Sequence, residues 1–162
     1  MQTTTEADDG RNDFDFLVGR WTIRHRRLKA RLAGCADWAE FDGTCVMRKT
    51  LRGLGNMDDN WLDLPEGPYA AVTFRRFDPV LRRWSIWWLD SRYPDIEPPV
   101  HGRIEGGVGE FLGEDVFDGR PIKVRFLWSA ITATRCEWRQ AFSADGGATW
   151  ETNWEMAFTR TG

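Results

Sequence analysis

Short segments of alternating apolar and polar residues follow one another along most of the chain. Clusters of Gly, Pro, Asp and Asn separate these segments about every eight to twelve residues. A period of two is typical of strands with one buried face, and turns at this spacing are typical of all-β sandwiches and barrels. We count about ten such segments, at residues 20–31, 37–50, 54–63, 68–77, 82–91, 99–106, 109–117, 121–130, 134–142 and 149–160.

The predicted strands are joined by short loops, and no long segment has the period and the caps of a helix. Consecutive hairpins favour an up-and-down arrangement, and closing the sheet into a barrel removes the exposed edge strands. We therefore expect one all-β domain over 13–162, a single antiparallel up-and-down β-barrel of about ten strands. Residues 13–17 are expected to form a short helical turn, and the polar residues 1–12 a flexible leader.

The alternation also predicts which side chains point into the barrel. On the last segment, the inward face is expected to carry Trp150, Thr152, Trp154, Met156 and Phe158. On the segment 82–91, it is expected to carry Trp84, Ile86, Trp88 and Asp90. A carboxylate among indoles is costly unless it is paired, so we expect Asp90 to pair with His25 or Arg103 across the interior.

His25 is the most informative residue of the first predicted strand. If Trp21 and Ile23 face inward, strand geometry turns His25 inward as well. An imidazole inside an apolar barrel could orient a ligand, act as a general base with Asp90 fixing its tautomer, or bind haem iron. The alternative is a core histidine tied to a neighbouring carboxylate or carbonyl. His101 is expected at the surface rather than in a ligand-binding role.

The aromatic content of the chain indicates what lines the barrel interior. Ten Trp and ten Phe among 162 residues provide more large flat surface than the packing of one domain needs. Since eight strands can already enclose a small ligand, we expect a cavity on the order of several hundred Å3 unless the indoles fill it. Besides His25 and Asp90, the expected ligand-binding residues are Trp61, Trp88, Arg103, Trp128, Trp138, Gln140 and Trp154, with Asn60 as a further candidate.

Charge and cysteine content narrow the function classes. A net charge of −3 and a pI of about 5.5 give no general attraction to nucleic acid or to anionic membranes. The basic run at 24–31 is divided between the two faces of a strand, so it is not expected to bind nucleic acid.

Cys35, Cys45 and Cys136 show neither a disulfide framework nor zinc-ligand spacing. This spacing predicts a protein without a metal. Because the sequence has no signal peptide or membrane-spanning segment, we expect a cytoplasmic protein.

Two further features carry resemblances to known families. The segment FLVGRW at 16–21 resembles the Gly-x-Trp segment of lipocalins and fatty-acid-binding proteins. That resemblance implies a helical turn closing one barrel end, with Trp21 packed against a basic side chain near the last strand, for which Arg160 is the candidate. The chain is also similar to a family of uncharacterised bacterial proteins in three blocks, which are FLVGRWTIRHRRL at 16–28, WSIWWLDSR at 84–92 and AFSADGGATWETNW at 141–154. This resemblance implies a calycin-like barrel and no settled activity.

The pattern of Ser143, Asp145, Gly147, Thr149 and Trp150 resembles the Asp-box, the hairpin motif repeated in sialidases and other propeller enzymes. Its Asp and Ser close a turn through side-chain to backbone bonds, and its Trp is expected to anchor the hairpin in the core. One copy cannot build a propeller, so we interpret the motif as a structural turn and not as a glycosidase signature.

Four functions remain open from the sequence. The first is a barrel that binds a small, largely apolar molecule, with His25 and Asp90 orienting it. The second is a cyclase, isomerase or lyase that confines its substrate in the same cavity and uses His25 as general base. The third is haem binding through His25; otherwise no cofactor is expected. The fourth is an interaction module in which Trp87 and Leu89 form an outer patch, which could equally be a homodimer contact.

Overall fold

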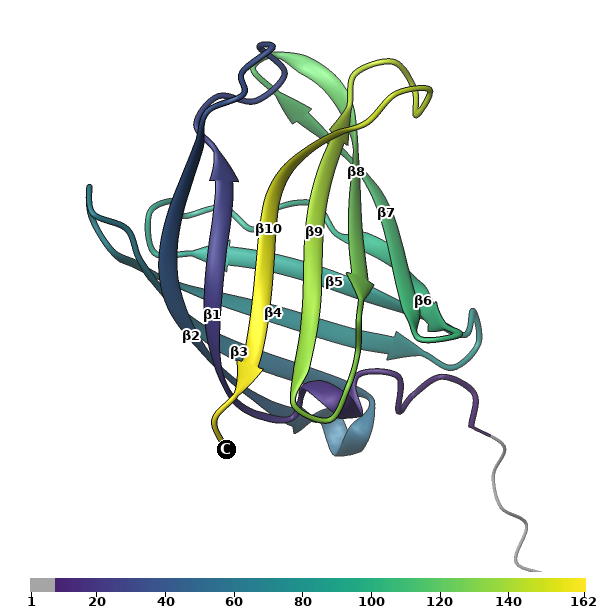
Figure 1. The fold of residues 1–162 in the computed structure, drawn as a ribbon. Helices are drawn as coiled ribbons and strands as arrows, with labels where there is room; N and C mark the ends of the chain where they lie inside the picture. The colour runs from purple at the N-terminus through teal and green to yellow at the C-terminus, as the bar shows by residue number, and fades with distance from the viewer. Residues whose placement is uncertain (1–7) are drawn as a thin grey trace, which may run out of the picture.

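The computed structural model describes residues 8–162, and the strands in this part of the chain form one closed antiparallel barrel (Figure 1). The strands are β1 (Gly19–Leu28), β2 (Trp38–Thr50), β3 (Gly55–Asp63), β4 (Tyr69–Asp78), β5 (Arg83–Asp90), β6 (Val100–Glu105), β7 (Val108–Phe117), β8 (Arg120–Ser129), β9 (Arg135–Ser143) and β10 (Glu151–Arg160). Two single 3-10 turns, η1 (Asp15–Leu17) and η2 (Leu51–Gly53), complete the regular structure.

Each strand pairs with its neighbour in the chain, and β1 also pairs with β10, which closes the barrel. The register of this closing ladder sets Ile23 opposite Phe158 and His25 opposite Met156. The predicted all-β, up-and-down barrel of about ten strands is therefore confirmed, and so is the short helical turn near the N-terminus.

The turn η1 covers one end of the barrel. Leu17 is fully buried there, and its carbonyl accepts a hydrogen bond of 2.9 Å from the indole N–H of Trp21. The guanidinium of Arg160 lies 4.2 Å from the centre of the Trp21 ring and donates a hydrogen bond of 2.8 Å to the carbonyl of Ala133. The Trp21–Arg160 contact implied by the lipocalin resemblance is present, and it seals this end against water.

The chain is packed against the barrel before the point where order was expected to begin. The indole N–H of Trp84 donates a hydrogen bond of 2.8 Å to the carbonyl of Gly10, and Gly10 is buried. Residues 8–12 are thus part of the packed domain, because a buried Trp donor needs an acceptor and the leader supplies it. The remainder of the predicted flexible leader, residues 1–7, lies outside the described residues.

A β-bulge in β10 changes which residues of the last strand face inward. The register between β10 and β9 shifts between Thr152 and Trp154, and both Asn153 and Trp154 are buried. The expected inward position of Trp150 is wrong for this reason: its ring lies under the guanidinium of Arg125, 4.5 Å away, on the outer side of β8.

The β9–β10 turn is closed by side chains. The hydroxyl of Ser143 accepts a hydrogen bond of 2.8 Å from the amide of Gly147, and the carboxylate of Asp145 accepts one of 2.9 Å from the amide of Thr149. These bonds are the ones expected of a structural turn at this motif.

The β5–β6 ladder is the shortest in the barrel. It joins only Trp84, Ser85 and Ile86 of β5 to β6. Beyond Ile86, β5 continues to Asp90, and the segment 91–99 returns beside it, with the amide of Glu97 bonded to the carbonyl of Trp88 at 3.1 Å. This arrangement brings Glu97 to the open end of the barrel.

Candidate ligand-binding site

The barrel encloses a cavity of about 600 Å3 that opens at the end opposite η1, where β1 ends. Loop residues between β1 and β2, between β5 and β6, and between β7 and β8 surround its mouth. The expected cavity of several hundred Å3 is therefore present, and the indoles line it without filling it. Its aromatic lining consists of Trp88, Tyr93, Phe117, Phe126, Trp128, Trp138, Phe142, Trp154 and Phe158.

The indoles of the middle wall hold one another in place. The ring of Trp154 lies edge-on to Trp88 and to Trp138, with centroid distances of 5.7 and 5.5 Å. Edge-to-face contacts of this kind favour one arrangement of the rings. They leave flat, rigid aromatic surface exposed to the cavity.

The inner part of the cavity contains a buried ion pair. Arg75 and Asp58 are 3% and 2% exposed, and their nitrogen and oxygen atoms lie 2.8 Å apart. Arg75 also donates to the side-chain oxygen of Asn56 at 2.9 Å, and Asp58 accepts from the amide of Thr73 at 3.2 Å. The guanidinium lies 5.0 Å from the ring of Phe14, so the pair sits toward the closed end.

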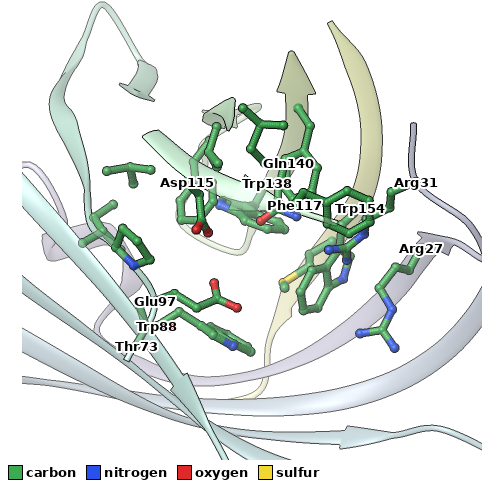
Figure 2. A pocket seen from close by; sticks show the side chains of 18 of the residues that line it. Arg27, Arg31, Thr73, Trp88, Glu97, Asp115, Phe117, Trp138, Gln140 and Trp154 are labelled. Atoms are coloured by element: carbon green, nitrogen blue, oxygen red, sulfur yellow. The ribbon is translucent and has the colours of Figure 1, made fainter. Parts of the chain in front are cut away.

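The mouth of the cavity has an acidic side and a basic side. Figure 2 shows Glu97 and Asp115 on one side and Arg27 and Arg31 on the other. Removal from water raises the pKa of Glu97, and the negative charge of Asp115 adds to that effect. Burial lowers the pKa of Arg31 to about 10, so Arg31 still carries its charge at neutral pH. A ligand that enters the barrel therefore passes between opposite charges.

Five of the residues expected to bind a ligand line this cavity: Trp88, Trp128, Trp138, Gln140 and Trp154. They come from β5, β8, β9 and β10. Gln140 donates a hydrogen bond of 2.8 Å to the side-chain oxygen of Asn153. Asn60, the further candidate, lines the cavity too. Their contact with a ligand remains a prediction.

Two other expected residues lie elsewhere. Trp61 is 47% exposed on the outer face of β3, because the alternating side chains that β3 turns inward are the polar Asn56, Asp58 and Asn60. Arg103 does not line the cavity. Its Nε lies 3.5 Å from the carboxylate of Asp13, so it ties the N-terminal segment to β6.

His25 faces inward as expected, but it lies behind the cavity wall. It is 2% exposed, it is not among the lining residues, and its ring stacks on Phe41 at 4.6 Å. Its Nδ1 accepts a hydrogen bond of 3.1 Å from the indole N–H of Trp154. A Cβ on Gly43 would come within 2.7 Å of Nε2, so a glycine is needed beside the ring. Burial, with the charge of Arg27, lowers the pKa of His25 to about 3.

Asp90 does not form the pair expected with His25 or Arg103. Its carboxylate accepts hydrogen bonds from the guanidinium of Arg92 at 3.0 Å and from the indole of Trp88 at 3.1 Å. Burial acts to raise the pKa of Asp90, but the bonds from Arg92 and Trp88 outweigh it, and the net pKa is lowered. The charge partner of Asp90 is therefore Arg92, two residues away in the chain, and not a residue across the barrel.

The outer surface carries the remaining candidates. Leu89 is 37% exposed, and the outward ring of Trp87 contacts Phe74 at a centroid distance of 6.1 Å. His101 is partly exposed, and its Nδ1 lies 2.7 Å from the hydroxyl of Ser85. Within residues 8–162, no helix has the length and apolar character needed to span a membrane.

Sequence reasoning missed the ion pair of Arg75 and Asp58. A usable signal was available in β4, where Tyr69, Ala71, Thr73, Arg75 and Phe77 alternate on the inward face. An arginine at an inward position requires an anion nearby, and the adjacent strand offers acidic residues at 58 and 59.

Comparison with known proteins supports the fold and no more. The chain matches no protein-family model and no curated protein. Among solved structures it is similar to the S-type phycobiliprotein lyase CPES from Guillardia theta, with a TM-score of 0.58 and 12% identity over 98% of each chain. This match confirms the calycin-like barrel, whereas membership of a bacterial family remains a prediction. The chain thus shares the lipocalin-like barrel fold of a phycobiliprotein lyase.

Proposed function

We propose that this protein binds a small, largely apolar molecule inside its barrel. The observation that carries the proposal is the cavity of about 600 Å3, open at one end and walled by rigid indoles. Concave, mostly apolar sites with a few convergent polar groups are the usual form of small-molecule sites. A structural neighbour that is named as a lyase is compatible with such a role.

The geometry around His25 argues against a role for its imidazole as a general base or as a haem ligand. A base must reach the proton that it removes, and an axial ligand needs a free nitrogen facing the iron. Nδ1 of His25 is engaged by Trp154, and the imidazole is separated from the cavity by that indole. We therefore favour binding over the enzymatic and haem alternatives that depended on His25.

Binding of the neutral fluorophore N-phenyl-1-naphthylamine tests the proposal. The wild-type protein should bind it saturably with a rise in fluorescence. The double variant Val124→Trp/Ile86→Trp adds two indoles to the cavity wall and should weaken binding at least about tenfold, because the probe loses its space. The matched control, Val46→Trp/Leu89→Trp, adds two indoles at positions that are 39% and 37% exposed, and should bind like wild type.

Equal binding by the cavity variant and the wild type would overturn the proposal, because the probe would then bind outside the barrel. Native mass spectrometry of freshly purified protein should in addition detect a retained small molecule whose mass is absent after denaturation.

A further inference from the structure

Two hydrogen-bond donors at the inner end of the cavity have no partner among residues 8–162. They are the indole Nε1 of Trp128 and the guanidinium Nε of Arg75, each on a side chain that is 3% exposed and lines the cavity. The guanidinium lies 5.8 Å from the centre of the Trp128 ring, so the two side chains that carry these donors are neighbours. Buried donors are normally satisfied, and an unpaired one costs free energy.

The charge of Arg75 is already neutralised. Asp58 lies 2.8 Å from one terminal nitrogen, and the other terminal nitrogen donates to Asn56. An anion placed here would meet the negative charge of Asp58 as well as the positive charge of Arg75, and it would lose its own hydration. An uncharged acceptor, such as a ketone, aldehyde or amide oxygen, avoids that cost.

We propose that the closed end of the cavity is a site for the uncharged carbonyl end group of the ligand, with Trp128 and Arg75 as the donors. The proposal rests on the proposed function, because it assumes that a molecule enters the barrel. It sets the orientation of that molecule: the carbonyl group enters first, its apolar body lies between Trp88, Trp138 and Trp154, and any charged group stays at the mouth.

Three naphthalene probes test the carbonyl site: 6-propionyl-2-dimethylaminonaphthalene, its analogue 6-propyl-2-dimethylaminonaphthalene, which has a CH2 in place of the carbonyl, and 6-dimethylamino-2-naphthoate. In the wild type, the ketone should bind about fivefold more tightly than the probe without a carbonyl, and at pH 7 the carboxylate should bind more weakly than the ketone. Trp128→Phe removes the donor and keeps most of the ring, so the preference for the ketone should disappear.

Trp88→Phe is the matched control. It makes the same change in the same cavity, but the indole N–H that it removes already donates to Asp90 in the wild type. This variant should bind all probes somewhat more weakly and keep the preference for the ketone. Loss of the preference in both variants, or in neither, would overturn the assignment of Trp128.

The remaining outcomes separate the two proposals. Equal binding of the ketone and of the probe without a carbonyl by the wild type would mean that the donors bind water only, which overturns the carbonyl site and leaves the proposed function standing. Tighter binding of the carboxylate would overturn the uncharged class. Binding of none of the probes would overturn both proposals.

A measurement on the wild type alone tests the carbonyl site even if a variant fails to fold. The infrared C=O stretch of the bound ketone, labelled with 13C, should shift to lower frequency than in an apolar solvent, as expected for a carbonyl that accepts hydrogen bonds. An unshifted band would overturn the proposal.

Discussion

The indole N–H of Trp154 donates to Nδ1 of His25 across 3.1 Å, and this one bond fixes the protonation state of the histidine. Because Nδ1 accepts, the neutral ring must carry its proton on Nε2. The same bond holds the Trp154 ring, which forms part of the cavity wall. His25 therefore supports the site from behind.

The pH dependence of stability should report this arrangement. The pKa of His25 falls from 6.5 to about 3 on folding, so between these values the unfolded state binds the extra proton. The free energy of unfolding should therefore keep its full value above pH 6.5 and fall as the pH is lowered toward 3. The slope that His25 contributes approaches about 1.4 kcal/mol per pH unit. Urea unfolding at a series of pH values measures it.

His25→Gln is the informative variant in that series, because the amide oxygen can still accept from Trp154 but does not titrate. The variant should lose most of the slope between pH 6 and 4 that the wild type owes to this histidine. His101→Gln, at a partly exposed site, should change the slope less. An identical slope in wild type and His25→Gln would show that His25 is not buried as a neutral ring.

The closed end of the barrel should depend on the guanidinium of Arg160. It stacks on Trp21 and donates to the carbonyls of Phe16, Val18 and Ala133, which join η1 and the β8–β9 loop to the last strand. Arg160→Lys keeps the charge but loses the planar fork, so we expect a loss of about 2 kcal/mol in the free energy of unfolding.

The control for that change is Arg139→Lys on β9, where the side chain is 52% exposed and lies 3.8 Å from Glu137. Such surface changes usually alter stability by less than about 0.5 kcal/mol. Chemical denaturation compares the two variants, and equal losses would contradict a special role for Arg160.

The fold was predictable from the sequence because period-two alternation and turn residues act locally. The same alternation placed Trp88, Trp128, Trp138 and Trp154 correctly on the inner face. It failed on β3, where polar side chains point inward and Trp61 points outward. The inward polar face of β3 is stabilised by the ion pair of Asp58 with Arg75 on β4. The pattern within one strand cannot predict such a pair, because it depends on two strands.

The partners of inward polar residues were the least predictable feature. Asp90 was expected to need a cation across the barrel, yet Arg92 folds back onto it from two residues away. His25 was expected to meet a carboxylate, and an indole bonds to it instead. Parity fixes the face on which a side chain lies, whereas the rotamers of neighbouring side chains decide which group it meets.

The ion pair of Arg75 and Asp58 should show strong coupling in a double-mutant cycle. Arg75→Met leaves the Asp58 carboxylate buried without its cation, and Asp58→Leu leaves the guanidinium buried without its anion. Each single change should cost about 3–5 kcal/mol of unfolding free energy. The double variant should cost well below the sum, because no lone charge remains. Additive losses, measured by urea unfolding, would argue against a direct pair.

The three cysteines should differ sharply in reactivity. Cys45 and Cys136 are each 1% exposed, and burial raises both thiol pKa values, that of Cys136 to about 12. Cys35 lies in the β1–β2 loop and is only partly buried. Since the thiolate is the reacting species, Ellman's reagent at pH 8 should label one thiol of the native protein rapidly, and three after denaturation.

Cys35→Ser identifies the fast thiol: the native variant should show no rapid phase, and its denatured form should release two equivalents of thionitrobenzoate from the reagent. Slow labelling of Cys45 and Cys136 in the native protein then reports opening of the barrel. Both face the interior near the closed end, where Cys45 lies opposite Trp21 and Cys136 opposite Phe158. Arg160→Lys should therefore accelerate that slow phase, because it loosens the contacts that cover this end. Rapid labelling of more than one thiol in the native wild type would contradict the burial of these two side chains.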